Sequence, residues 1–330
     1  MGLFRKIRKN FKHETFSFLG IKFNLKTKEY CFLKRFCTNL NLADYGQSNR
    51  ISIPQKPASK AFLRRGGGDL DLNAKIFGNN NLIQLSNIAP SKLNLNIYGN
   101  NNTIILSDDI KINGFINIGT AEYNVHNSKI FIGKNVIINN LNISIINGEN
   151  QELKIEGNNF IEELPASLFS DTKLLIKEKT NIYNCPRCVL QKNAIVEIGE
   201  NNHIVDIFID VDKHSKIKIG NNCAFSWQTV LYPDDQHSIL DMQNNILNKT
   251  PHEIIIGNHC WIGFGCKFLH NAQIQDNTIV GMNSLINKKF TESHIIIAGQ
   301  PAKIIKKNIR WDLSTPTDYL EKISIINNLK

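Results

Sequence analysis

The sequence contains no long apolar run. Hydrophobic residues make up 42% of the chain, yet no stretch approaches the roughly 18 consecutive apolar residues of a membrane-spanning helix. The basic N-terminus is not followed by the apolar core and cleavage site of a secretory signal, and MGLFRK lacks the Ser or Thr of a myristoylation signal. We therefore expect a cytoplasmic protein, with peripheral association at the inner face of the membrane through its N-terminal segment as a further hypothesis.

The sequence also lacks a convincing set of metal ligands. Its seven cysteines are an odd number, and Cys185-Pro-Arg-Cys188 is the only C-x-x-C pair. A zinc site needs a second such pair or histidines at ligand spacing, and a redox pair needs a thioredoxin-like βαβ context; neither is present. We interpret the pair as a structural corner, and we expect reduced thiols and no metal.

Positive charge is concentrated in one segment. The formal net charge is +10, and residues 1–38 hold ten Lys or Arg against two acids, which leaves +2 for the remainder. Because the body has no basic stripe with interleaved aromatics, we do not expect a nucleic-acid partner. Residues 1–13 place apolar side chains on one helical face and basic ones around it. This helix would dock on an anionic membrane surface or a capsule-synthesis complex, or pack on its own domain; the sequence leaves both interpretations open.

A six-residue repeat is the strongest pattern in the chain, and it covers residues 254–290. Every sixth residue is large and apolar, and the residue four places later is small. A helix needs a period of about 3.6 and an ordinary strand a period of 2, so the hexads predict a solenoid of short strands and corners. The first positions are Ile256, Ile262, Phe268, Ile274, Val280 and Ile286, and the small positions are Cys260, Cys266, Ala272, Thr278 and Ser284.

A longer repeat precedes the hexads. KIFGNNNLI (75–83) recurs as NIYGNNNTI (96–104), and glycines continue the ladder at intervals of about 21 residues. Gly and Asn adopt the left-handed backbone that a sharp corner needs. We expect an all-β solenoid, a left-handed parallel β-helix with longer, irregular N-terminal coils and a C-terminal helix within 312–330. The expected boundaries are 1–73 for the basic segment and linker, with a strand pair at 16–35, then 74–294 for the β-helix and 295–330 for the closing segment.

The hexad pattern is interrupted once, by residues 232–253. An insertion in a solenoid becomes a loop on one edge, and such loops commonly carry function. This one contains Tyr232, Asp234, Asp235, His237, Ser238 and His252. The imidazole of His237 could take a proton from a sugar hydroxyl as that oxygen attacks an acyl group. Asp235 could orient it, and Tyr232, Asp234 and Ser238 are candidate substrate-binding residues.

Three features together carry a resemblance to a known family: the hexads, the segment DDQHSI followed by WIG, and IIIAGQPAKIIKKNIRW (295–311). They resemble the hexapeptide-repeat acyltransferases, which are left-handed β-helices that use an acyl-coenzyme A. Within that superfamily the chain is most similar to the O-acetyltransferases of capsular or surface polysaccharides, including those acting on polysialic acid capsules. The resemblance covers about 215–311 well and 75–214 only as a style of repeat.

This resemblance implies a role for particular residues. His237 would be the general base of a direct transfer from acetyl-CoA, and Trp261 would frame the acceptor and the thioester. Cys260 and Cys266 would point into the wall and would not be nucleophiles. The family is typically trimeric with sites between subunits, so His237 would act with a neighbour's Trp261. The implied coenzyme-binding positions are Trp261, Gly263, Gly281, Lys288, Pro301, Ala302 and Lys303, beside two departures from the family pattern, Met282 and Asn287.

Three alternatives remain at this stage. The first is N-acetylation of an amino-sugar nucleotide on the same fold. The second is a γ-type carbonic anhydrase, which needs an H-x4-H pair that the sequence lacks. The third is a non-catalytic β-solenoid that binds polysaccharide. The long upstream coils favour a polysaccharide or oligosaccharide acceptor over a small molecule. Trp311 is expected to pack against the terminal helix.

Overall fold

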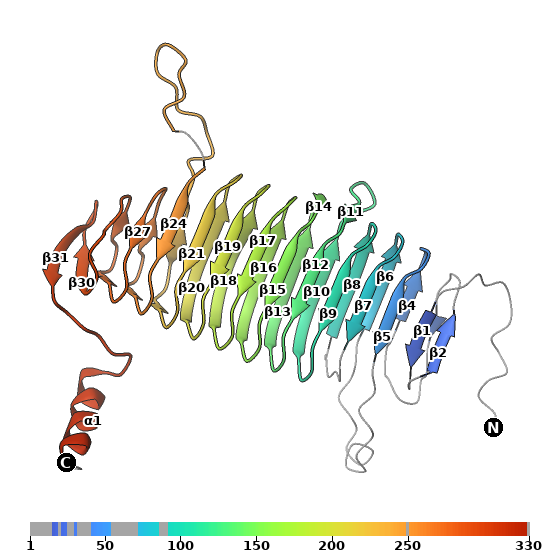
Figure 1. Cartoon of the computed structure of the whole chain (residues 1–330), viewed down its shortest axis with the longest axis horizontal. Helices are drawn as coiled ribbons and strands as arrows, with labels where there is room; N and C mark the ends of the chain where they lie inside the picture. Colours follow the sequence, from blue (N-terminus) through green and yellow to red (C-terminus); the bar gives the residue numbers. More distant parts are fainter. Residues whose placement is uncertain are drawn as a thin grey trace.

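The described part of the chain forms an elongated rod of stacked β-strands with one helix at its C-terminal end (Figure 1). The computed structural model describes residues 15–18, 21–24, 30–31, 41–53, 72–85, 92–248 and 251–328. The helix predicted at 1–13 and most of the expected linker therefore lie outside the described residues. Within the described part, consecutive coils pair in parallel along the rod, which confirms the expected class, a parallel β-helix with longer N-terminal coils and a C-terminal helix.

One wall of the rod is a continuous sheet to which each coil contributes one short strand. Its order follows the chain from β5 onward, with an antiparallel hairpin at the start. The hairpin confirms the strand pair predicted within 16–35. The strands are, in order, β2 (Ile21–Asn24), β1 (Thr15–Phe18), β5 (Arg50–Ile53), β7 (Leu82–Leu85), β9 (Thr103–Leu106), β12 (Lys129–Ile132), β15 (Glu152–Ile155), β17 (Lys173–Ile176), β19 (Ile195–Ile198), β21 (Lys216–Ile219), β24 (Glu253–Ile256) and β27 (Gln273–Ile274).

Strand length in the remaining walls changes along the rod. The upstream coils use one longer strand each: β4 (Asn41–Asp44), β6 (Leu72–Phe77), β8 (Lys92–Tyr98), β10 (Lys111–Ile118), β13 (Ile137–Ile145), β16 (Phe160–Leu168), β18 (Asn181–Leu190) and β20 (His203–Val211). β20 then pairs with two short strands, β22 (Ala224–Phe225) and β23 (Thr229–Leu231). The hexad coils continue this division with β25 (Trp261–Ile262), β26 (Lys267–Phe268), β28 (Ile279–Val280) and β29 (Leu285–Ile286). The longer upstream period therefore reflects a longer bent strand, and the hexads begin where that strand divides. Three short strands complete the described part: β3 (Tyr30–Cys31) pairs antiparallel with β4, and β11 (Val125–His126) and β14 (Gly148–Glu149) form a separate two-stranded sheet.

The parallel ladder extends upstream of the expected start at Ala74. β4 pairs in parallel with β6, and β5 pairs in parallel with β7. The G-N-N signal on which the expected start depends belongs to corners, and these earlier strands carry no such signal immediately before them.

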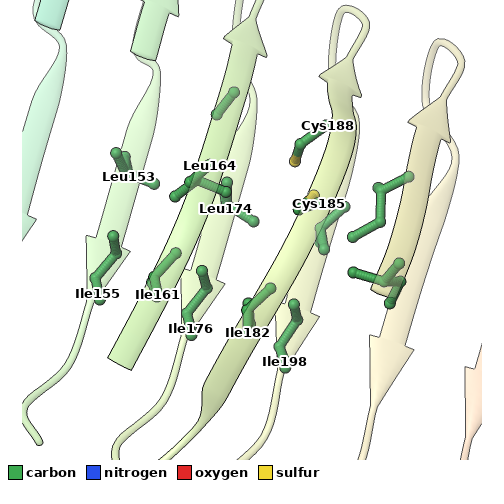
Figure 2. Packing of buried hydrophobic residues seen from close by; sticks show 14 of the residues in the cluster. Leu153, Ile155, Ile161, Leu164, Leu174, Ile176, Ile182, Cys185, Cys188 and Ile198 are labelled. Atoms are coloured by element: carbon green, nitrogen blue, oxygen red, sulfur yellow. The ribbon is translucent and has the colours of Figure 1, made fainter. Parts of the chain in front are cut away.

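The interior is filled as the hexads predict. The large first positions, such as Ile262 and Phe268, and the small positions, such as Cys260 and Ala272, are all buried. In the upstream coils, Leu153 and Ile155 face the side chains of β16 across the interior (Figure 2). Burying such apolar area contributes about 25 cal/mol per Å² to folding. Cys185 and Cys188 are both buried at a bulge of β18 (Figure 2), which agrees with a structural role for the pair.

Asparagine builds the corners. Asn80 and Asn101 have φ angles of 56° and 59°, in the left-handed region that Asn tolerates better than most residues. One position later, Asn81 and Asn102 are buried, and the Nδ2 of Asn102 donates to Asn81 Oδ1 at 3.0 Å and to the Val125 carbonyl at 2.9 Å. These buried amides satisfy carbonyl groups that the turn would otherwise leave without partners.

The C-terminal segment closes the ladder with a hairpin. β30 (Ile295–Ala298) extends the parallel wall beyond β28, and β31 (Lys303–Lys307) pairs with it antiparallel. α1 (Pro316–Asn328) then lies off the end of the rod (Figure 1), and the apolar side chains of Leu320 and Ile326 on it are exposed. None of the helices in the described part of the chain is long and apolar enough to cross a membrane.

Candidate active site

The insertion in the hexads is a built hairpin. It leaves the rod after β23 and returns before β24, and it projects from the edge of the solenoid (Figure 1). Leu240 and Ile246 form an antiparallel bridge. Asp241 closes the turn by accepting hydrogen bonds from the Asn245 side chain and from the backbone N–H groups of Asn245 and Gln243, each at 2.8 Å. These bonds, with the Asn245 side chain first, lower the pKa of Asp241.

The backbone of His237 is held while its ring is not. Its N–H donates to the Asp235 carbonyl at 2.7 Å, and its own carbonyl accepts from Asn248 Nδ2 at 2.7 Å. The side chain is exposed, and its imidazole has no hydrogen-bond partner among the described residues. A ring on a fixed backbone with both nitrogens open can exchange a proton with a bound substrate.

Asp235 contacts a different histidine. Its Oδ2 accepts from Asn248 Nδ2 at 3.1 Å, and its Oδ1 lies 3.7 Å from His270 Nδ1. The ring of His270 lies 5.2 Å from that of His252, which is buried. Asp235 is therefore linked to His237 through the backbone and through Asn248, and the two side chains do not meet within the described chain.

Sequence reasoning missed His270 and Asn248 as neighbours of the loop, although a signal for His270 was present. Leu231 pairs with Phe268, and the Tyr232 N–H donates to the Phe268 carbonyl at 2.9 Å. Because successive coils stack in register, the root of the insertion must meet the corner that follows Phe268. Asn248 had no such signal, since its position depends on how the hairpin folds back.

The other loop residues differ in how accessible they are. Asp234 is only 7% exposed; its Oδ1 accepts from the Gln236 N–H at 3.1 Å, and its Oδ2 has no partner among the described residues. Tyr232 is half-buried, and burial followed by the nearby Asp210 carboxylate raises its pKa. Ser238 is exposed. The structure thus exposes Ser238 and, in part, Tyr232, and it buries Asp234 at the root of the loop.

Trp261 lies on the next wall. It begins β25 and is 46% exposed. β24 separates it from the insertion along the chain, and among the described residues no contact joins it to His237. Trp311, in contrast, lies beside it, with ring centroids 6.1 Å apart.

The expectation that Trp311 packs against the terminal helix is wrong. Its ring stacks on His259 with centroids 4.3 Å apart and planes 15° apart, and its Nε1 donates to the His259 carbonyl at 2.7 Å. The chain after β31 therefore passes back over the coil that carries Trp261. Trp311 lies on His259 and not on the helix because its indole N–H finds a carbonyl acceptor there.

Two of the coenzyme-binding candidates form a smooth strip of wall. The Gly263 N–H donates to the Val280 carbonyl at 2.9 Å and the Gly281 N–H to the Ile297 carbonyl at 2.8 Å, so the two glycines lie in adjacent coils. A Cβ on Gly281 would come within 2.9 Å of Ala298 Cβ. Met282, the departure from the family pattern, is exposed beside this strip. An extended chain could lie flat on the strip, which fits the pantetheine arm of a coenzyme A.

The remaining coenzyme candidates lie at the C-terminal end of the rod. Lys288 and Lys303 are exposed cations, and the Nζ of Lys288 lies 5.2 Å from the Phe290 ring centroid. Pro301 is exposed, whereas Ala302 is buried and its N–H donates to the Leu285 carbonyl at 2.9 Å. Ala302 therefore anchors the segment, and the two lysines could meet phosphates. Within the described ranges, no group of three or more His, Cys, Asp or Glu could hold a metal ion.

Comparison with known proteins identifies the family of the chain. Residues 253–288 match the family described as bacterial transferase hexapeptide (six repeats). A polysialic acid O-acetyltransferase of Neisseria meningitidis is 31% identical over 208 residues, which cover 61% of this chain and 86% of that protein. The chain belongs to the hexapeptide-repeat acyltransferases. It is therefore an acyltransferase, and the resemblance stated from its motifs is confirmed.

Other relatives of this acyltransferase are more distant. A 24.8 kDa protein in the cps region of Klebsiella pneumoniae is 28% identical over 205 residues, covering 59% of this chain and 76% of that protein. Among solved structures, the polysialic acid O-acetyltransferase OatWY is 21% identical, with coverage of 86% of this chain and 99% of that one and a TM-score of 0.38.

Proposed function

We propose that this hexapeptide-repeat acyltransferase transfers an acetyl group from acetyl-CoA to a hydroxyl of a capsular or other cell-surface polysaccharide in the cytoplasm. The observation that carries the proposal is the His237 imidazole, which is exposed and has no hydrogen-bond partner in the described chain, on a backbone held by Asn248 and Asp235. The activity named for the Neisseria meningitidis relative, polysialic acid O-acetylation, supports a polysaccharide acceptor.

The reaction is a direct transfer with His237 as general base. His237 removes the proton of the acceptor hydroxyl as its oxygen attacks the thioester carbonyl. The tetrahedral intermediate then collapses to the acetyl ester, and the C–S bond breaks. The departing thiolate takes the proton from the imidazolium, which returns His237 to its neutral form. General base catalysis of this kind contributes typically about 10²- to 10⁴-fold in rate.

Two buried thiols support a mechanism without an acyl-enzyme. Cys260 and Cys266 are both fully buried in the wall. A side-chain hydrogen bond with Cys223, followed by burial, raises the pKa of Cys260. Burial raises the pKa of Cys266. A thiol that stays protonated and has no access to substrate is a poor nucleophile.

The complete site is proposed to form between subunits. His237 stands on the insertion before β24, and Trp261 begins the strand after it, with no contact between them in the described part of one chain. A homotrimer in which His237 of one subunit faces the neighbour's Trp261 would join the base to the coenzyme strip at Gly263 and Gly281. In this arrangement Tyr232 and Ser238 meet the acceptor, Asp234 and Asp235 hold the root of the loop, and Lys288, Pro301 and Lys303 bind the coenzyme.

The experiment that tests this proposal is an acceptor panel. The protein is incubated with labelled acetyl-CoA and with surface polysaccharides, oligosaccharides and amino-sugar nucleotides, and the product is analysed by NMR. A base-labile ester on a polysaccharide hydroxyl is the expected product. An amide on an amino-sugar nucleotide would show N-acetylation instead. Binding to a glycan without binding of acetyl-CoA would show a non-catalytic solenoid and overturn the proposal.

A further inference from the structure

An exposed row of aromatic rings runs along the wall that leads to Trp261. Phe160, Tyr183 and His203, called here the aromatic stripe, come from the successive coils β16, β18 and β20. Ring centroids are 5.6 Å apart for Phe160 and Tyr183 and 5.1 Å apart for Tyr183 and His203. Tyr183 is 41% exposed, and the other two rings are half-buried. The rings support one another, so their exposed faces are held in place without a ligand.

The strand register connects the stripe to the candidate site. His203 pairs with Ala224, and Ala224 pairs with Trp261. Parallel partners in neighbouring coils are separated by about 4.8 Å. Ala224 carries only a methyl group, so a gap of about one coil separates the last ring of the stripe from Trp261. A ligand lying along the rod would meet the stripe first and Trp261 next.

The groups that flank the stripe are acceptors and amides. Asn139 Nδ2 donates to Glu162 Oε2 at 2.7 Å, and Asn184 Nδ2 donates to Asp206 Oδ1 at 3.0 Å. The stretches 159–164, 181–184, 202–207 and 223–228 beside the stripe contain no Lys or Arg. Arg187, farther along β18, is paired with Asp210, with 2.6 Å between Nε and Oδ2. A polyanion would be repelled beside the stripe, since its charges would meet the carboxylates of Glu162 and Asp206, while the guanidinium of Arg187 is already paired with Asp210. A neutral chain rich in hydroxyl groups would find acceptors beside each ring.

We propose that the aromatic stripe binds an uncharged stretch of the acceptor polysaccharide and directs it to Trp261. A pyranose has C–H bonds on its faces and hydroxyl groups around its rim. The C–H face stacks on the negative face of an aromatic ring, while the hydroxyl groups of the rim donate to the carboxylates of Glu162 and Asp206. This inference rests on the proposed function and narrows its substrate to glycans that carry neutral sugars along this wall.

The test compares long and short acceptors with matched variants. Tyr183→Ala is expected to raise KM for the polysaccharide by about tenfold, the effect of losing one well-placed aromatic contact, and to leave kcat/KM for a mono- or disaccharide acceptor unchanged. Tyr123→Ala is the control, because Tyr123 is a more exposed tyrosine outside the stripe. Glu162→Gln, at an exposed position, is expected to strengthen retardation of the protein in native gels containing a polyanionic glycan such as hyaluronan. Circular dichroism confirms that each variant is folded.

Several outcomes would overturn the inference while sparing the proposed function. Transfer to a polysaccharide with the same KM for wild type and Tyr183→Ala is one, and transfer only to polyanionic polysaccharides is another. A change of oligomeric state in Tyr183→Ala would show that the stripe is a contact between copies of the chain. If no polysaccharide is acetylated, the proposed function fails. Native gels that contain a neutral glycan (dextran, mannan or galactan) then test the aromatic stripe separately. If these glycans do not retard the protein, the proposed binding of neutral sugars by the stripe is rejected.

Discussion

Asp235 Oδ1 lies 3.7 Å from His270 Nδ1, so the carboxylate next to the proposed base is directed at another histidine. The pair joins the root of the insertion to the corner after β26, and Asn248 bridges the same carboxylate to the backbone of His237. The carboxylate and the amide fix where His237 stands, while its ring carries no partner among the described residues.

His237→Ala is expected to lower kcat by about 10² to 10⁴, the usual contribution of a general base, with little change in the melting temperature because the side chain is exposed. Steady-state release of coenzyme A measures the effect. His270→Ala is the matched control and is expected to keep most of the activity. If His270→Ala were as inactive as His237→Ala, the role of general base would be assigned to His270.

Asn248→Ala removes the two hydrogen bonds that the Asn248 amide donates, to the His237 carbonyl and to Asp235 Oδ2. We expect a fall in kcat of about tenfold through poorer positioning of His237, without loss of acetyl-CoA binding. Titration of acetyl-CoA by calorimetry, alongside kcat, separates the two effects. Unchanged kcat would mean that the hairpin holds its shape without this amide.

Trp261→Ala is expected to raise KM for acetyl-CoA and to lower kcat. Trp261→Phe should change both parameters less, because it keeps an aromatic face. Trp227→Ala provides the comparison, since Trp227 is more exposed than Trp261 and has no proposed role. Equal kinetics for Trp261→Ala and the wild type would remove Trp261 from the site.

Lys303→Ala and Lys288→Ala are expected to raise KM for acetyl-CoA several-fold and to leave KM for acetyl-pantetheine unchanged, because the pantetheine substrate lacks the nucleotide phosphates that the cations would meet. The difference should shrink at high salt. A similar rise with both donors would indicate that the lysines support the fold of the closing segment.

Deletion of residues 1–13 is expected to spare acetyl transfer to a soluble acceptor and to weaken sedimentation with anionic vesicles, with neutral vesicles as the control. The physical basis is the loss of five Lys or Arg, since residues 1–13 contain five basic residues and no acid, and each cation near an anionic surface contributes about 1 kcal/mol. If sedimentation with anionic vesicles were unchanged, residues 1–13 would have a structural role and not a membrane-binding one.

The repeat made much of the fold predictable. One large and one small residue per hexad determine which side chains fill the interior, so the inward positions of Ile262 and Cys260 follow from the pattern alone. The G-N-N motif that contains Asn101 likewise made the position of the corner predictable. The candidate site was less predictable. Its pairings, such as Asp235 with His270 and Trp311 with His259, depend on how a non-repeating loop and tail fold back onto the coils, and periodicity contains no information about either.

The stacking of single strands also makes the rod a spacer. Along the first wall, eight steps lead from β5 to β24, which at about 4.8 Å each amounts to roughly 40 Å. If the N-terminal segment docks on a membrane, which the sequence leaves open, such a rod would hold the insertion at a fixed height above that membrane. Each coil contacts chiefly its two neighbours, so a shorter or longer stack would change that stand-off without altering the chemistry at the far end.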